Sequence, residues 1–328
     1  MKYHFIINPK AGTGKKSEEL SKQIEEVCED CGIDYCIYIT KAPLDATEYV
    51  KRAVKSNDCP QRFYACGGDG TLGELINGAP NTENVEFGLI PIGTGNDFRR
   101  NFSNKEMFFD IKRQIEGESV KIDLMKYNDR YCVNIINIGF DCNVVYEMGK
   151  IKNLKFIPNK LAYIVGIVVT LFKKMCSQIK ISADSIPDIN RELLLIAIAN
   201  GKYYGGGFKA APYSSLHDAK IDVSIIEKIS RFTFFSLVAK YKKGVHLETR
   251  KGKQCITYLK TDSLSLDFDT PKSICVDGEI ESATHIDIKI VPNAASFIIP
   301  KGVVETEKDS EFPDTTTIVN YAASVKNK

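Results

Sequence analysis

Residues 67–71 have the composition of a phosphate-binding turn, Gly-Gly-Asp-Gly-Thr, and follow a short apolar run. The glycines let the backbone approach a bulky anion closely. Asp69 can hold Mg²⁺ directly or through water, and Thr71 can cap the following helix and contact a phosphate oxygen. A plain turn capped by an aspartate would not need so many glycines, so the segment predicts a nucleotide phosphate site.

Two other segments repeat the pattern of an apolar run, a polar turn with glycines and a helical stretch. Residues 91–98 read Pro-Ile-Gly-Thr-Gly-Asn-Asp-Phe and supply a second glycine-rich turn with a carboxylate. Residues 8–15 read Asn-Pro-Lys-Ala-Gly-Thr-Gly-Lys, where backbone N–H groups and a helix dipole can hold phosphate. They do not form a P-loop, because Pro9 replaces the first glycine and Lys16 the serine or threonine. Alone, this segment is equally typical of an ordinary turn.

The elements that must position these turns alternate along the N-terminal third of the chain. Apolar runs predict strands at residues 3–7, 35–39, 63–66 and 87–91, and helical spacing predicts helices at 17–28, 46–54 and from 73 onwards. This alternation indicates parallel strands joined by right-handed crossovers. Because such a sheet binds ligands at the carboxyl ends of its strands, the turns should converge on one crevice.

From about Asp123 the pattern changes to period-two alternation, which predicts antiparallel strands packed as a β-sandwich. The predicted strands are residues 131–138, 179–183, 193–199, 221–226, 255–259, 264–268, 273–276, 286–291 and 297–300, with helices at 158–176 and 231–245. The predicted fold is therefore an α/β nucleotide-binding domain (1–125) followed by an antiparallel β-sandwich domain (126–302). Residues 303–328 are polar and are expected to form a disordered tail.

Composition narrows the class of protein. The 328 residues suffice for two domains, and a net charge of +2 gives no strong overall field towards nucleic acid. No secretory signal is visible, and the longest apolar stretch, residues 161–172, is shorter than the roughly 20 residues that span a bilayer. This stretch is typical of a buried helix, but its flanking lysines would also suit an anionic membrane surface. We expect a cytoplasmic protein, peripheral at the inner membrane surface, with reduced cysteines.

Residues 67–71 resemble the nucleotide-binding signature shared by diacylglycerol kinases, sphingosine kinases, 6-phosphofructokinases and NAD kinases. Residues 93–98 narrow the resemblance to the lipid kinases, and it runs from about Lys2 to Pro300. It is strongest to the soluble bacterial diacylglycerol kinase-like proteins. The resemblance implies an NAD kinase-like nucleotide domain and a β-sandwich with the active site between them. It also implies ATP and Mg²⁺ as cofactors, a lipid alcohol as acceptor, a role in phospholipid biosynthesis and a homodimer.

The resemblance assigns site residues position by position. The residues expected to contact ATP are Asn8, Pro9, Lys10, Ala11, Gly12, Thr40, Gly67, Gly68, Asp69, Gly70, Thr71, Thr94, Gly95, Asn96 and Asp97. Residues 137–141 resemble a conserved turn entering the lipid domain, and residues 200–212 a glycine-rich segment. In bacterial relatives the stretch corresponding to 215–222 holds a structural Mg²⁺, here through the Asp218 carboxylate and the backbone carbonyls of Ser215 and Lys220. Ala219 departs from the usual glycine, and a positive φ there would put the metal in doubt.

Residues 277–279, Asp-Gly-Glu, form the last candidate motif. A hydroxyl nucleophile needs a carboxylate to orient it and accept its proton, but the same tripeptide is also a common hairpin turn. The resemblance places the catalytic base here, and either Asp277 or Glu279 fits. Asp69 completes the predicted catalytic set, and its replacement by alanine is expected to remove most turnover and leave the fold intact. NAD kinase activity and a non-catalytic nucleotide-binding regulator are the alternative functions.

Overall fold

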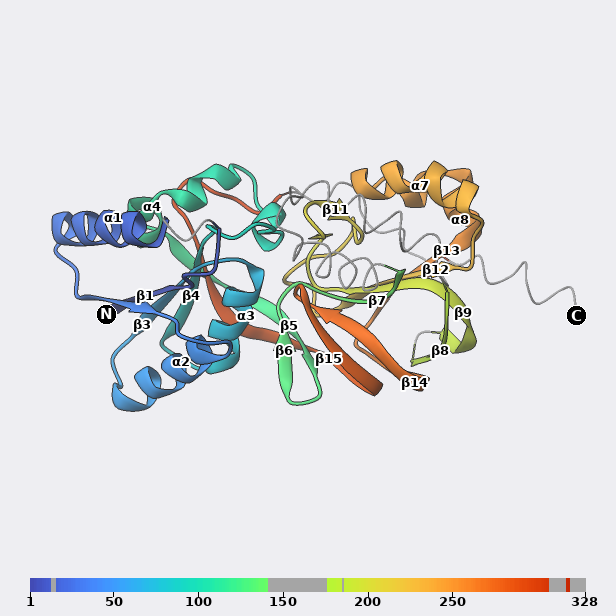
Figure 1. The fold of residues 1–328 in the computed structure, drawn as a ribbon, viewed down its shortest axis with the longest axis horizontal. Helices are drawn as coiled ribbons and strands as arrows, with labels where there is room; N and C mark the ends of the chain where they lie inside the picture. The colour runs from blue at the N-terminus through green and yellow to red at the C-terminus, as the bar shows by residue number, and fades with distance from the viewer. Residues whose placement is uncertain (13–15, 141–175, 185, 307–316, 319–328) are drawn as a thin grey trace, which may run out of the picture.

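The computed structural model describes residues 1–12, 16–140, 176–184, 186–306 and 317–318. The molecule is elongated, with an α/β part at one end and a β-rich part at the other (Figure 1). The predicted helix at 158–176 lies outside the described residues except for its last residue. Four residues of the predicted motifs also lie outside them: Thr13, Gly14, Lys15 and Asp141. Among the described helices, none has the length and apolar character needed to cross a membrane.

The N-terminal sheet is parallel, as its alternating pattern predicts. Its strands are β1 (Lys2–Ile7), β2 (Tyr35–Ile39), β3 (Gln61–Cys66) and β4 (Val85–Ile90), in the spatial order β2-β1-β3-β4. Helices α1 (Lys16–Cys31) and α4 (Ile111–Ile115) pack on one face, and α2 (Asp45–Ser56) and α3 (Asp69–Gly78) on the other. Phe5 and Ile7 point towards α1, while Ile6 points towards α2 and α3, since successive strand residues face opposite sides.

The β-rich part is antiparallel, and its strands enclose one of two apolar clusters. Its strands are β6 (Arg130–Cys132), β7 (Ile135–Gly139), β8 (Ser177–Ala183), β9 (Ile186–Ala199), β12 (Ile221–Glu227), β13 (Ile256–Thr261), β14 (Ser263–Val276) and β15 (Glu279–Ile299), with β10 (Tyr203–Tyr204) and β11 (Phe208–Lys209) as a separate pair. The long strands β9 and β14 each pair with β7 along one stretch and with β8 along another. The sheet therefore closes over its inward-facing isoleucine and leucine side chains, and the predicted fold class is confirmed.

Helices α7 (Arg231–Lys243) and α8 (Arg250–Cys255) lie over β12 and β13 (Figure 1). Short 3₁₀ turns complete the described helices at η1 (Phe98–Asn101), η2 (Lys105–Phe109) and η3 (His246–Glu248). Cys255, predicted to begin a strand, instead ends α8, and the strand starts one residue later.

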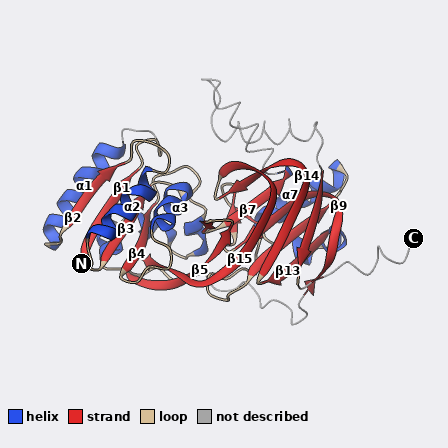
Figure 2. Cartoon of the chain, turned by 90° about the horizontal axis from the view of Figure 1, so that it is seen from below, coloured by secondary structure: helices blue, strands red, loops and turns tan. Residues whose placement is uncertain are grey.

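Two long strands connect the two parts of the molecule (Figure 2). Strand β5 (Glu118–Tyr127) was not predicted; it pairs with β15, whose last residues also pair in parallel with β4. Residues 286–291 and 297–300, predicted as separate strands, belong almost entirely to β15, and 264–268 and 273–276 both belong to β14. The end of the β-rich segment thus returns to the N-terminal sheet and fixes the two parts against each other.

Two other sequence predictions need correction. Residues 131–138 form two strands, β6 and β7, because the intervening N–H groups turn away to bind a carboxylate described below. Residues 303–306, assigned to the polar tail, are packed: Val303 is buried and Thr306 bonds the backbone of Asn101. Strand β16 (Thr317–Ile318) pairs with β13, and the rest of the tail lies outside the described residues.

The buried ring of His246 should make stability fall in acid. Burial lowers the pKa of His246 to about 3, whereas the ordinary value is 6.5. Below pH 6.5 this histidine is therefore protonated in the unfolded chain but stays neutral in the folded chain. Its contribution to the free energy of unfolding is complete above pH 6.5 and decreases as the pH drops towards 3, by up to about 1.4 kcal/mol per pH unit. Urea unfolding across this range should show a flatter pH dependence in His246→Leu. Identical slopes in the two proteins would contradict this assignment.

Candidate active site

The glycine-rich turns meet at the carboxyl ends of β1, β3 and β4, as the sequence predicts. Gly93 N donates to Gly67 O at 2.9 Å, so the turns after β3 and β4 lie directly against each other. A Cβ atom at Gly93 would lie 2.6 Å from the Gly68 Cα, which no side chain can tolerate. Gly93 is therefore required for the close contact between the two turns.

Asp69 holds the two turns together. Its Oδ2 accepts a hydrogen bond from the Asp97 N–H and its Oδ1 accepts one from the Phe98 N–H, both at 2.9 Å. Burial raises the pKa of Asp69 to about 6, and the nearby charge of Asp97 adds to the shift. Because the carboxylate anchors the second turn, Asp69→Ala should loosen this turn locally even where the fold stays intact.

The first turn is tied to the same centre. The Asn8 amide donates to Thr71 Oγ1 at 3.2 Å, while Asn8 Oδ1 accepts from the Lys10 N–H at 3.0 Å. Thr40, at the end of β2, donates its N–H to Ile7 O at 2.9 Å. The described part of the 8–15 segment thus lies beside Thr71, which supports a shared role with residues 67–71.

Three neighbouring cavities of about 230, 160 and 220 Å³ form a cleft around these turns, and all three have Glu74 and Glu279 in their walls. Ten of the residues predicted to contact ATP line the second or third cavity: Asn8, Pro9, Lys10, Ala11, Gly12, Thr40, Gly68, Gly70, Thr71 and Thr94. Gly70 also lines the first cavity. Gly67, Asp69, Gly95, Asn96 and Asp97 lie behind this wall and shape it. The cleft is polar and open, as a triphosphate site requires.

Asp277 and Gly278 form a two-residue hairpin turn between β14 and β15, and Glu279 is the first residue of β15. Asp277 and Gly278 have φ values of 46° and 94°, the left-handed pair that an Asp-Gly hairpin adopts. The Asp277 carboxylate accepts backbone N–H bonds from Val133 at 2.8 Å, Asn134 at 2.9 Å and Ile135 at 3.1 Å. The Cys132 thiol donates a further bond at 3.1 Å. These donors fix the position of the Asp277 carboxylate at the junction of β6 and β7.

Glu279 is placed differently. It is exposed to the cleft, and no described residue donates a hydrogen bond to its carboxylate. Its Oε1 lies 3.2 Å from the position that a Cβ on Gly70 would occupy, so it faces the 67–71 turn. Partial burial raises its pKa, and the neighbouring Glu74 raises it further. A carboxylate that is free, directed at the phosphate turn and raised in pKa is suited to accept a proton.

Asp97 connects the cleft to the β-rich part. Its Oδ2 accepts from the Gly206 N–H at 2.8 Å, and its Oδ1 accepts from the Arg100 guanidinium at 3.0 Å. Beside it, the buried Asn96 amide donates to the carbonyls of Pro91 at 2.9 Å and Gly93 at 2.8 Å. These residues therefore position both the second turn and residues 205–207, which belong to the glycine-rich segment at 200–212.

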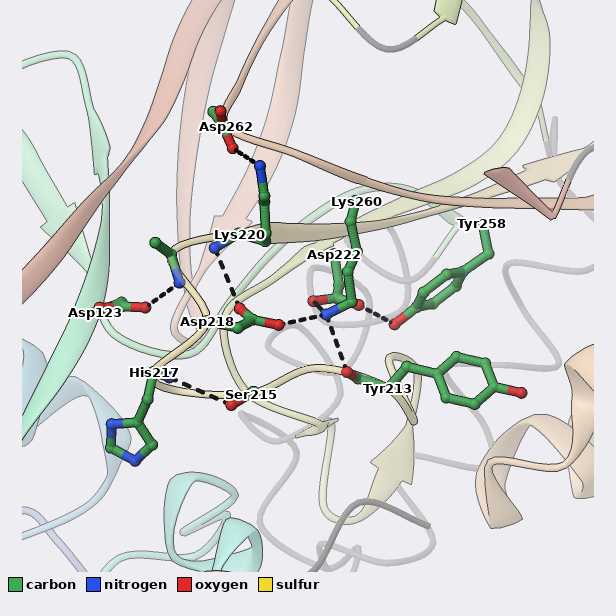
Figure 3. Close-up of polar contacts among 11 residues, drawn as sticks. Asp123, Tyr213, Ser215, His217, Asp218, Lys220, Asp222, Tyr258, Lys260 and Asp262 are labelled. Atoms are coloured by element: carbon green, nitrogen blue, oxygen red, sulfur yellow. Dashed lines mark hydrogen bonds and ion pairs between the residues drawn. The ribbon is translucent and has the colours of Figure 1, made fainter. Parts of the chain in front are cut away.

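None of residues 215–222 lines the three cavities of the cleft. Figure 3 shows the polar contacts of this loop. Ala219 has a φ of 54°, the strained conformation considered from the sequence. Asp218 does not face solvent: its Oδ2 accepts a bond from the Lys260 ammonium at 2.7 Å. Burial alone would lower the pKa of Lys260, but Asp222 and Asp218 together raise it, so the side chain is charged.

Sequence reasoning missed two contributors. Glu74 lies four residues after Gly70 on α3, a spacing that puts both on one helix face and could have indicated its place in the cleft. Lys260 has no such local signal, because it reaches Asp218 from a strand 42 positions further along the chain.

Two protein-family models match this sequence, and together they cover most of the chain. The family model of the diacylglycerol kinase catalytic domain matches residues 2–127, and that of the YegS C-terminal NAD kinase beta sandwich-like domain matches 134–299. A diacylglycerol kinase of Staphylococcus carnosus (strain TM300) is 27% identical over 308 residues, covering 92% of this chain and 96% of the relative. A diacylglycerol kinase of Bacillus subtilis (strain 168) is 27% identical over 279 residues, covering 84% and 88%.

Among solved structures, a diacylglycerol kinase from Bacillus anthracis str. Sterne superposes with a TM-score of 0.64. The superposition covers 92% of this chain and 98% of that one, at 22% identity. At this identity the likeness concerns the fold, and it extends over both the α/β part and the β-rich part.

Proposed function

Because the chain belongs to the diacylglycerol kinase family, we propose that it transfers the γ-phosphoryl group of ATP to a hydroxyl of diacylglycerol or a related lipid alcohol. The observation that carries the proposal is the position of Glu279, a free carboxylate that faces the glycine-rich phosphate turn across a shared cleft. A non-catalytic nucleotide-binding protein would not need a base there.

In the proposed reaction the turns at residues 8–12, 67–71 and 93–97 hold the triphosphate. Lys10 lines the same cleft, and its ammonium can offset phosphate charge. Glu279 accepts the proton of the lipid hydroxyl while the hydroxyl oxygen bonds to the γ-phosphorus. The bond from that phosphorus to the β,γ-bridging oxygen breaks, and ADP leaves.

The residues around Asp69 fit a divalent cation that would accompany ATP. Asp69 and Asp97 lie close enough for their charges to repel, and a cation would relieve this repulsion. Asp69 would hold Mg²⁺ directly or through water, and the ion would neutralise charge that develops on the transferred group.

The test is label transfer from radiolabelled ATP by the purified protein with Mg²⁺. Detergent-dispersed diacylglycerol, sphingosine, ceramide, monoacylglycerol and phosphatidylglycerol would be offered in parallel, with NAD as the control. Label in a lipid product supports the proposal and identifies the acceptor. Label on NAD alone would favour NAD kinase activity, and ATP binding without transfer to any acceptor would favour the regulator.

Access to a lipid acceptor requires contact with a membrane, and α7 carries a surface suited to it. Phe232 and Phe235 are 89% and 58% exposed, although a large exposed aromatic side chain is costly in water. The exposed basic residues near them are Lys228, Arg231, Lys240, Lys242 and Lys243. Aromatic side chains beside basic ones favour an anionic bilayer surface.

Replacing both phenylalanines by serine should therefore weaken binding to vesicles that contain phosphatidylglycerol by roughly 30-fold or more, since each aromatic ring contributes about 1 kcal/mol or more when buried. Co-sedimentation would measure the loss. Phe109→Ser is the matched control, because Phe109 is also exposed but belongs to η2 in the α/β part. Equal binding by the double variant and the control would rule out α7 as the docking surface.

A further inference from the structure

Of the three predicted ligands of a structural cation near residues 215–222, the Asp218 carboxylate already has a cationic partner that belongs to the protein. The Lys260 ammonium lies 2.7 Å from Asp218 Oδ2, 2.9 Å from Asp222 Oδ2 and 3.1 Å from the Tyr213 carbonyl oxygen (Figure 3). Carboxylate and carbonyl oxygens are the ligands that Mg²⁺ and Ca²⁺ prefer. An ammonium group has three N–H donors, which matches these three oxygens.

Strand register fixes the ammonium in this position. Lys260 on β13 lies directly opposite Asp222 on β12, so the two side chains project from the same face of the sheet. Tyr258, two residues earlier on the same face, donates its hydroxyl to Asp222 Oδ1 at 2.6 Å. Asp222 therefore has one oxygen for the tyrosine and the other for the lysine.

The group is enclosed. The side chains of Lys260, Asp222 and Asp218 are only 15%, 0% and 22% exposed. A divalent ion at Asp218 would lie within a few ångströms of the ammonium, where like charges repel strongly in a region with little water.

We propose that the Lys260 ammonium replaces the structural divalent cation of this loop, so that residues 213–222 keep their conformation without a bound metal. The predicted Mg²⁺ ligand Asp218 then serves as the partner of a lysine. The proposal concerns the β-rich part and does not depend on the acceptor or on catalysis.

The loop conformation shows why a cation is needed there. Asp123 Oδ2 accepts the Ala219 N–H at 2.7 Å and so fixes this residue at its positive φ. Asp218 Oδ1 accepts the Lys220 N–H at 3.2 Å, which turns the Asp218 carboxylate inwards. Two inward carboxylates, those of Asp218 and Asp222, must then be neutralised, and Lys260 supplies the charge from the neighbouring strand.

Thermal melts without nucleotide, in EDTA and in millimolar Mg²⁺ or Ca²⁺, would test the proposal. The Tm of the natural protein should be the same in EDTA and in either metal. Lys260→Met keeps the length of the side chain but removes its charge, so its Tm in EDTA should fall on the order of 5–10 °C. Millimolar Mg²⁺ or Ca²⁺ should restore much of this loss, because the vacated oxygens can then bind the ion.

Two further variants distinguish the loss of a cation from an unspecific loss of stability. Lys220→Met removes an exposed lysine on the same loop that pairs with Asp262, and it should change neither the Tm nor the response to metal. Lys260→Met combined with Asp218→Asn removes one of the two carboxylates, so it should regain stability and lose the response to metal. A natural protein that loses stability in EDTA would overturn the proposal. A folded Lys260→Met whose Tm does not change with metal would also overturn it. Binding of Mn²⁺, measured by electron paramagnetic resonance, would provide an independent readout.

Discussion

Glu279→Gln is expected to lower kcat by about 10²–10⁴-fold, because the amide cannot accept the hydroxyl proton. The Tm should change little, since no described residue donates a hydrogen bond to Glu279 and glutamine has the same shape. Label transfer to the accepted lipid and a thermal melt of the same preparation measure the two quantities. The KM for ATP should remain close to that of the natural protein, because the phosphate turns are unchanged.

Asp277→Asn is the matched variant at the other end of the hairpin, and its expected phenotype is the reverse. The Asp277 carboxylate accepts three backbone N–H bonds, and an asparagine would turn its own NH₂ group towards some of these donors. Leaving a buried donor unsatisfied costs about 1–3 kcal/mol, so the Tm should fall while part of the activity remains. A stable but inactive Asp277→Asn together with an active Glu279→Gln would make Asp277 the base instead.

The pH profile gives a second readout for Glu279. Its pKa is raised above the ordinary 4.5 by partial burial and by Glu74, and the base must be deprotonated to act. Activity should therefore fall as the pH drops through this raised pKa, with the acid limb of kcat/KM lying above pH 4.5. In Glu279→Gln the residual activity should lack this limb.

Local patterns predicted the features of the site that depend on local geometry. The glycine-rich turns follow strands because each apolar run is short and ends in residues that allow a sharp turn, and parallel strands bring their carboxyl ends together. The Asp-Gly hairpin at 277–278 was equally recognisable. The choice between Asp277 and Glu279 was not, because it depends on the N–H groups of residues 133–135, more than 140 positions earlier in the chain.

The same limit explains the elements that were missed. Strand β5 was not recognised as a strand from its own sequence; it is stabilised as one by pairing with β15, more than 160 positions later. The role of Lys260 likewise depends on the register between β12 and β13, because the residues around position 260 do not indicate that its ammonium contacts the 215–222 loop. A resemblance transfers a ligand position such as Asp218, but it does not show that the ammonium of a side chain on another strand already lies beside that carboxylate.

Asp69→Asn is expected to lower kcat by about 10²–10³-fold, for two reasons that can be separated. An asparagine can accept only one of the two N–H bonds from Asp97 and Phe98, so the second turn loosens. It also lacks the charge that would hold Mg²⁺. Asn96→Ala is the control for the first effect, because it removes the side-chain bonds to Pro91 and Gly93 within the same turn but alters no carboxylate.

Titrating the activity with Mg²⁺ at saturating ATP separates the two roles. If Asp69 only positions the second turn, Asp69→Asn and Asn96→Ala should both raise the KM for ATP, and both should need the same Mg²⁺ concentration as the natural protein. If Asp69 also holds the metal, only Asp69→Asn should need more Mg²⁺, by roughly 10-fold or more for the loss of one charged ligand. We expect the second result, because burial and the repulsion from Asp97 both raise the pKa of Asp69, and a bound cation would oppose the repulsion.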